Sequence, residues 1–201
     1  MPISCREGRI ARGIALPVAV AASLRSLTDR DLTTATRWAG GVCLAATLVM
    51  LRFERAMHAT GGPGIIAFEL AGSEHRTTDI LDRWGPRGAA AARTSLRLDF
   101  GYMCSYGVFA ALLAEGADRR LTQRHLGDRV RPWAQVACAA AVAADAREGV
   151  ALLSILRGRD RRVHASRARK AALTKFTMLS AVLLYWAMSH VSERQIRTRR
   201  G

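Results

Sequence analysis

The sequence predicts an all-α, polytopic membrane protein, an up-down bundle of four transmembrane helices with an interfacial amphipathic helix between spans one and two. Half of the 201 residues are hydrophobic although the mean hydropathy is only +0.05, so apolar and charged residues must be segregated along the chain. The arginines fall in the gaps between apolar blocks. In the block at 132–156, Asp145, Arg147 and Glu148 lie within a stretch long enough to cross a bilayer. Charged residues within an apolar membrane span predict a polar site inside a membrane protein.

The strong positive charge of the chain indicates lipid as its acidic partner. A formal net charge of +15 would also suit nucleic acid. Because the arginines flank apolar blocks, they would meet lipid phosphates, so we expect the bilayer and anionic headgroups at the Arg-rich loops as partners, and no nucleic acid. Cys43, Cys104 and Cys138 lie in three different apolar blocks without metal-ligand spacing. We therefore predict a packing role for these cysteines, and neither a metal nor a cofactor.

The chain is expected to form one domain between two basic tails. Residues 1–37 contain an apolar run that is too short to span a membrane, so we predict a retained, partly disordered tail with a short helix opening at Thr28 or Asp29. Residues 192–201 are predicted to be a basic, unstructured tail. The transmembrane domain, residues 38–191, has its four spans at about 38–57, 98–114, 132–156 and 171–191.

The region between the first two spans has a predicted structure of its own. GGPG at 61–64 forces a turn, and a short apolar stretch with Glu69 follows it. Ser73 is a good N-cap for an amphipathic helix, which the Gly-Pro pair ending at Pro86 terminates. We expect this helix to lie on the bilayer surface with Trp84 at headgroup depth. After Pro86 the chain is predicted to run as one helix into the second span.

The second span supplies a polar face. Asp99, Tyr102 and Tyr106 recur at steps of three and four residues, which places the carboxyl and both hydroxyls on one side of a helix. The segments 115–131 and 157–170 are rich in arginine and are predicted to be polar loops after the second and third spans.

In an antiparallel bundle the intramembrane charges converge on one half of the membrane. Asp145 and Glu148 would lie about 16 and 12 Å below the end of span three at about 1.5 Å per residue. Lys175 lies one turn into span four on the same side, and Asp99 begins span two there. The opposite half is expected to hold no buried ionisable residue. Because an intramembrane carboxylate costs roughly 2.5 to 3.5 kcal/mol, these groups should face the interior and pair or meet water.

We therefore predict a polar intramembrane cluster with Lys175 as counter-ion for an acidic residue of span three. Its members are Asp99, Tyr106, Asp145, Glu148 and Lys175, with Glu69 and Trp84 at the rim.

The residues of this cluster lie in segments with a family resemblance. FELAGS, the ILDRWG helix, LRLDFGYMCSYG, the acidic DAREG and a lysine early in the last span resemble an uncharacterised family of four-helix bacterial integral membrane proteins. The resemblance covers about residues 38–190 and implies a multi-pass protein of the bacterial cytoplasmic membrane, with no known activity. The chain departs from the family pattern at Gly149, where an Asn is expected after the Glu of span three.

The sequence leaves three functions open for the cluster. It could bind or move a small polar solute, a proton or a lipid headgroup. It could instead be an ion-pair network that only fixes helix packing in a structural or partner-binding protein. Thirdly, the acids could serve a membrane-embedded, lipid-modifying enzyme as general acid and base. A homodimer is a further expectation, because a lone four-span chain of this size rarely makes a complete carrier. Metal chemistry through His58, His75 and Glu69 is the least favoured, since these histidines lack ligand spacing.

Overall fold

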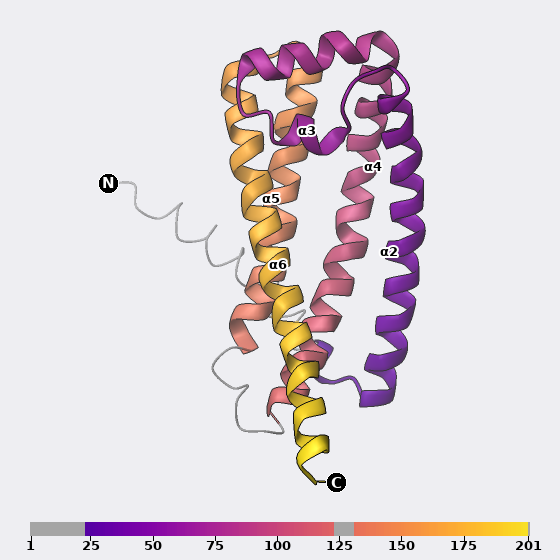
Figure 1. Ribbon diagram of the computed structural model, residues 1–201, viewed down its shortest axis with the longest axis vertical. Helices are drawn as coiled ribbons and strands as arrows, with labels where there is room; N and C mark the ends of the chain where they lie inside the picture. The colour runs from indigo at the N-terminus through magenta and orange to yellow at the C-terminus, as the bar shows by residue number, and fades with distance from the viewer. Residues whose placement is uncertain (1–22, 123–130, 201) are drawn as a thin grey trace, which may run out of the picture.

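The computed structural model describes residues 23–122 and 131–200, and these residues form helices and turns without any strand. The all-α prediction is therefore confirmed for this part of the chain. Four long helices run along one axis, and α3 with the start of α4 lies across one end, here called the capped end (Figure 1). The helices are α2 (Asp29–His58), α3 (Ile65–Glu69), α4 (Glu74–Thr122), α5 (Arg131–Leu156) and α6 (Arg161–Arg200).

Helix α2 begins where the sequence predicts a helix start. The hydroxyl of Thr28 caps the helix by accepting a hydrogen bond of 3.2 Å from the Asp31 amide, and Asp29 and Asp31 lie in the positive first turn. Among the long helices α2 packs chiefly against α4, whereas α5 and α6 pack against each other and against α4. Helices α2 and α6 therefore do not pack closely against each other.

Helix α4 contains a break at the predicted position. Gly85 adopts φ 55° and ψ −166°, which is outside helical geometry, and Pro86 restarts the helix. The segment before the break lies across the end of the bundle, and the segment after it runs down the bundle axis (Figure 1). Beyond the predicted end of span two at Ala114, α4 continues to Thr122, so the predicted polar loop at 115–131 is wrong for residues 115–122.

Helix α6 is also longer than predicted. Its start at Arg161 turns most of the predicted 157–170 loop into helix, and its helical backbone extends through the tail that was predicted to be unstructured. The connection from α5 is a tight turn in which Gly158 has φ 79°, and the Asp160 carboxylate accepts a hydrogen bond of 3.1 Å from the Val163 amide at the start of α6.

The segment from Glu74 to Trp84 buries its apolar face, with Trp84, in the bundle and leaves its polar face exposed, so Trp84 is not available to lipid headgroups as predicted. Trp84 is only 1% exposed, stacks on Phe68 at 4.9 Å between ring centroids and donates a hydrogen bond of 2.6 Å to the Pro63 carbonyl. Ile80 is buried in the same apolar cluster, which includes Leu152 of α5. The apolar face of this helix therefore covers the end of the bundle, because α3, α5 and α6 offer it an apolar surface.

In the part of the chain that the structure describes, two helices are long and apolar enough to cross a membrane, Asp29–His58 and Arg161–Val191. The prediction of four such spans is therefore supported by length and composition for two of them. In α4 and α5 charged residues interrupt the apolar runs, and Asp145, Arg147 and Glu148 lie together in the middle of α5.

The exposure of side chains is inverted relative to a water-soluble bundle. Six ionisable side chains are at most 8% exposed, namely Glu69, Glu115, Asp118, Asp145, Glu148 and Lys175. Large apolar side chains are exposed on all four long helices, including Trp38, Leu48, Phe100, Val108, Trp133, Val150, Leu184 and Met188. A soluble domain rarely combines so many exposed apolar side chains with buried charges.

Candidate functional site

The centre of the site is the ammonium group of Lys175, which is buried between three helices. Its Nζ lies 2.9 Å from Asp145 Oδ1, 2.9 Å from Glu148 Oε2 and 3.4 Å from Glu69 Oε2. The contact with Glu148 is an ion pair whose angles fall outside hydrogen-bond geometry. All four residues are 8% exposed or less. The structure thus brings together the acids of α5 with the lysine of α6, and places Glu69 in the cluster itself rather than at its rim.

Tyr106 of α4 joins this cluster through its hydroxyl, which donates a hydrogen bond of 2.6 Å to Asp145 Oδ2. Asp145 therefore accepts from Lys175 on one oxygen and from Tyr106 on the other. The ring of Tyr102 stands edge-on to Tyr106 at 5.5 Å, and the Tyr102 hydroxyl lies 3.1 Å from that of Thr47 on α2. These contacts connect α2, α4, α5 and α6 through polar side chains.

Helix α3 positions Glu69, and two residues of the preceding chain fix α3. The Glu54 carboxylate of α2 accepts a hydrogen bond of 2.9 Å from the Ile65 amide, which satisfies an otherwise unpaired donor at the start of α3. Gly64 lies so close to Glu54 that a Cβ at this position would overlap the carboxylate. The GGPG turn therefore allows the Glu54 carboxylate to hold α3 in place at the capped end.

The acids of the cluster outnumber its cation. Glu69, Asp145 and Glu148 surround a single ammonium, and Asp99 lies nearby with its carboxyl partly exposed. Burial raises the pKa of Glu69 above its usual range against the attraction of the Lys175 ammonium, and the negative charge of Asp145 also raises it. Buried acids in excess over cations favour a protonated carboxyl. The site therefore favours a bound proton or another positive charge.

A cavity of about 420 Å³ lies beside the cluster, between α2, α3, α4 and α6. The polar residues of its wall are Glu69, Asp99, Tyr102, Tyr106, Asp145 and Lys175. The rest of the wall is apolar and consists of Met50, Ile65, Ile66, Leu96, Phe109, Ala110, Leu113, Phe176, Leu179 and Leu183, with Ser95. Since Leu183 is 51% exposed and Ile66 is 55% exposed, the cavity reaches the outer surface of the bundle. We call this space the central cavity.

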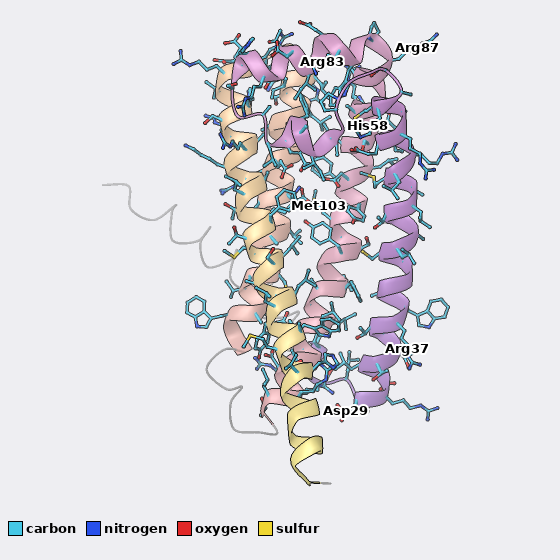
Figure 2. The ribbon with its side chains drawn as sticks, in the orientation of Figure 1. Asp29, Arg37, His58, Arg83, Arg87 and Met103 are labelled. Atoms are coloured by element: carbon cyan, nitrogen blue, oxygen red, sulfur yellow. The ribbon has the colours of Figure 1, made fainter. Side chains whose placement is uncertain are left out.

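Of three predicted site residues, two lie in the wall of the central cavity and one does not. Asp99 and Tyr106 both line the central cavity. Trp84 packs in the apolar cluster of the capped end and is absent from the cavity wall, so its predicted rim position is wrong. Figure 2 shows His58 and Arg83 toward the capped end, Met103 in the middle and Asp29 at the opposite end.

A second polar group, which includes the buried Glu115 and Asp118, lies at the opposite end of the bundle, so the prediction that this half holds no buried ionisable residue is wrong. Arg119 of α4 contacts Glu115 at 3.0 Å and Asp29 at 2.7 Å, and donates to the carbonyls of Leu24 and Leu27. The Tyr185 hydroxyl donates to Asp118 at 2.6 Å. This group was not predicted because the second span was expected to end at Ala114. The spacing of Glu115 and Arg119 by four residues was the available signal of a continued helix.

The histidines named in the sequence analysis have local acidic partners. His58 Nε2 lies 3.4 Å from Glu54, and His75 Nδ1 lies 3.6 Å from Asp79, each at helical spacing. Within residues 23–122 and 131–200, no group of three or more His, Cys, Asp or Glu side chains could hold a metal ion.

The comparison with known proteins adds no family to this description. Neither a protein-family model, nor a curated protein, nor a solved structure matches the chain.

Proposed function

We propose that this chain is a multi-pass protein of the bacterial cytoplasmic membrane in which all four long helices cross the bilayer. Exposed apolar side chains on each long helix, together with charges buried between them, support this placement. For α4 and α5, the buried carboxylates that lower their apolar character are paired inside the bundle and do not contact lipid. Paired interior charges are the arrangement in which membrane helices tolerate ionisable residues.

We further propose that the protein binds an amphipathic molecule in the central cavity, with its polar head at the charge cluster and its apolar chain along α4 and α6. The observation behind this proposal is the composition of the cavity wall, which combines the charge cluster with apolar side chains over the remainder. A volume of about 420 Å³ lies within the range of small-ligand sites, roughly 300 to 1,000 Å³. The exposed Ile66 and Leu183 in the wall leave a route for a chain entering from lipid.

The head of the bound molecule should carry a cationic group. Lys175 already contacts three carboxylates, so an anionic head would find no free cation among the described residues of the wall. Asp99 lines the wall and has no hydrogen bond or ion pair with another described residue. A primary amine at Asp99 would offset the excess of acids, as in a lipid with an aminoethyl headgroup.

The test compares two lysolipids with the same acyl chain, lysophosphatidylethanolamine and lysophosphatidylglycerol, titrated into the purified full-length protein in detergent. We expect Asp99→Asn to weaken binding of the amine-bearing lysolipid about tenfold, which corresponds to about 1.4 kcal/mol. Asp82→Asn, on the exposed face of the capping helix, is the matched control and should bind as the wild type does. Equal binding by Asp99→Asn and the wild type would refute the cationic-head proposal.

The structural interpretation of the cluster has one observation in its favour, the engagement of Lys175 with three carboxylates. Under that interpretation the charges only hold α3, α5 and α6 together, and the central cavity has no ligand. Failure of both lysolipids to bind any form of the folded protein would favour it.

A further inference from the structure

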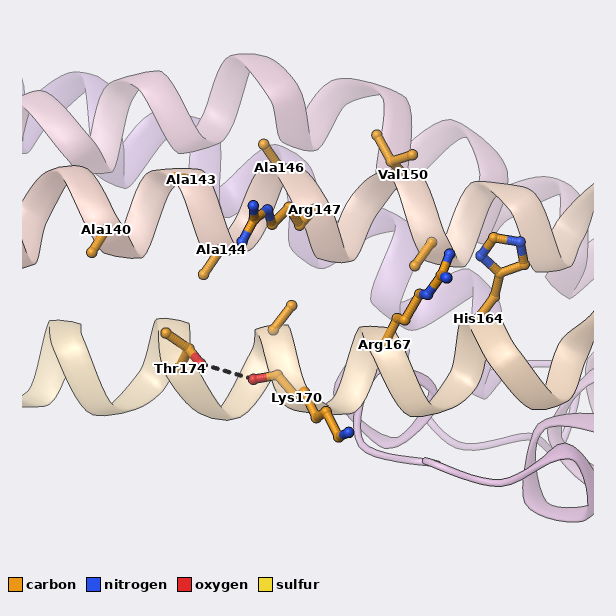
Figure 3. Close-up of a pocket in the computed structure, with 12 residues that line it drawn as sticks. Ala140, Ala143, Ala144, Ala146, Arg147, Val150, His164, Arg167, Lys170 and Thr174 are labelled. Carbon is orange, nitrogen blue, oxygen red and sulfur yellow. Dashed lines mark hydrogen bonds between the residues drawn. The ribbon is translucent and has the colours of Figure 1, made fainter. Parts of the chain in front are cut away.

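A second cavity lies on the other side of the α5 and α6 pair and shares no wall residue with the central cavity. It is an open groove of about 870 Å³. Its wall combines small or branched apolar residues with basic side chains (Figure 3). We call it the α5–α6 groove, and its wall comprises Ala140, Ala143, Ala144, Ala146, Arg147, Val150, Ala151, His164, Arg167, Lys170, Ala171 and Thr174.

The basic side chains of this groove have no acidic partner. The wall contains three cationic residues and a histidine, and no carboxylate. In Figure 3, Arg167 and His164 extend from α6 toward α5, Arg147 lies along α5, and Lys170 points away from the groove. Among residues 23–122 and 131–200, no side chain forms a hydrogen bond or ion pair with Arg147, Arg167 or the His164 ring. The positive charges of Arg147 and Arg167 are therefore available to a ligand.

The exposed, unpaired side chain of Arg147 favours an anionic partner in a membrane. Arg147 is exposed on the outer face of α5 and comes nine residues before the helix end at Leu156, or about 14 Å along the axis. A guanidinium at that depth costs several kcal/mol in lipid unless it reaches the headgroups or is paired. Arg167 lies nearer the membrane surface, six residues after the start of α6 at Arg161. The two guanidinium groups thus lead from the headgroup region into the groove.

The alanines explain why the ligand can be a lipid rather than a small anion. Ala140, Ala143 and Ala144 leave a trough that continues from Arg147 toward the middle of the membrane. Thr174 Oγ1 donates to the Lys170 carbonyl at 2.9 Å, so the hydroxyl in the wall is already satisfied. An acyl chain fits an apolar trough of this kind, and a phosphate fits a pair of guanidinium groups.

We infer that the α5–α6 groove binds one anionic glycerophospholipid, with its phosphate between Arg147, Arg167 and His164 and one acyl chain over the alanine floor. The inference depends on the proposed membrane placement of α5 and α6 but not on a ligand in the central cavity. The central cavity is acidic and would select a cationic head, whereas this groove is basic and selects an anionic one.

The experiment measures lipid retention by native mass spectrometry of the full-length protein, purified and exchanged into mixed phosphatidylglycerol and phosphatidylcholine. We expect one phosphatidylglycerol to remain bound to the wild type, and its apparent affinity to fall at least tenfold in Arg147→Gln with Arg167→Gln. Ala143→Leu, which fills the trough and keeps every charge, should lower the affinity to a similar degree. Arg87→Gln with Arg97→Gln removes the same charge from exposed positions outside the groove and should retain the lipid.

Four results would overturn the inference. Equal retention of phosphatidylcholine would remove the role of the anionic head. Equal losses in the groove variant and the Arg87 and Arg97 control would indicate general charge attraction. Competition by millimolar inorganic phosphate as effective as that by phosphatidylglycerol would indicate a site for free anions. A dimer that dissociates on Ala143→Leu with lipid retention unchanged would identify the groove as a subunit interface. Melting temperatures of all variants establish that each one is folded.

Discussion

At the scale of the residue, Asp145 is the position where the four-helix arrangement and the proposed site meet. One carboxylate oxygen accepts from Lys175 at 2.9 Å and the other from Tyr106 at 2.6 Å, so α4, α5 and α6 are joined at one buried group. The sequence predicts from depth alone that Lys175 pairs with an acid of span three, Asp145 or Glu148. It does not predict that Glu69 takes part, because the turn that brings α3 under the capped end cannot be derived from hydropathy.

Tyr106→Phe tests the contribution of this group to stability. Loss of the hydroxyl leaves Asp145 with one partner, and we expect the free energy of unfolding in mixed micelles to fall by about 1 to 2 kcal/mol. Tyr102→Phe is the matched control, because Tyr102 lines the same cavity four residues earlier but contacts Thr47 instead of the cluster. Its cost should stay below about 1 kcal/mol. Equal costs for the two variants would show that the bond to Asp145 adds nothing beyond ring packing.

At the scale of the element, helix α3 depends on the residues that precede it. Gly64→Ala would push the Glu54 carboxylate away from the Ile65 amide, and we expect a loss of about 1 to 3 kcal/mol for the unpaired donor and acceptor. Gly41→Ala is the control, because a Cβ there meets nothing within 4 Å and alanine favours a helix by up to about 1 kcal/mol. Thermal unfolding in detergent measures both. A Gly64→Ala protein as stable as Gly41→Ala would contradict the role given to Glu54.

The boundaries of the helices show what local sequence signals can and cannot determine. Thr28 and the Gly85–Pro86 pair act on the backbone of their own neighbours, so the start of α2 and the break in α4 were predictable. The face of an amphipathic helix is visible in sequence, but its partner is not, and Trp84 therefore was assigned to lipid when it packs on Phe68. Likewise Glu115 and Asp118 were assigned to a loop because a charge buried by tertiary contacts looks the same in sequence as a solvated one.

At the scale of the whole molecule, the bundle has polar groups inside, apolar groups outside and two cavities of opposite charge. The central cavity has an excess of acids, and the α5–α6 groove has only basic charged side chains. The sequence predicts that charges converge on one half of the bundle. It does not predict the second polar group around Arg119, or that α2 and α6 do not pack closely against each other. The resemblance to a four-helix bacterial family, the bacterial membrane and a homodimer stay predictions.

The measurement that tests the central claim most directly is the amphiphile content of two neighbouring tryptophan variants of α6. Leu183 lines the central cavity and is 51% exposed, whereas the adjacent Leu184 is 64% exposed and outside the cavity wall. The protein is taken from membranes washed with alkaline carbonate, and its bound molecules are identified by native mass spectrometry. We predict that the wild type and Leu184→Trp retain an amine-bearing amphiphile and that Leu183→Trp loses it at an unchanged melting temperature. Recovery of the protein in the carbonate wash, or equal retention by both variants, would contradict the account.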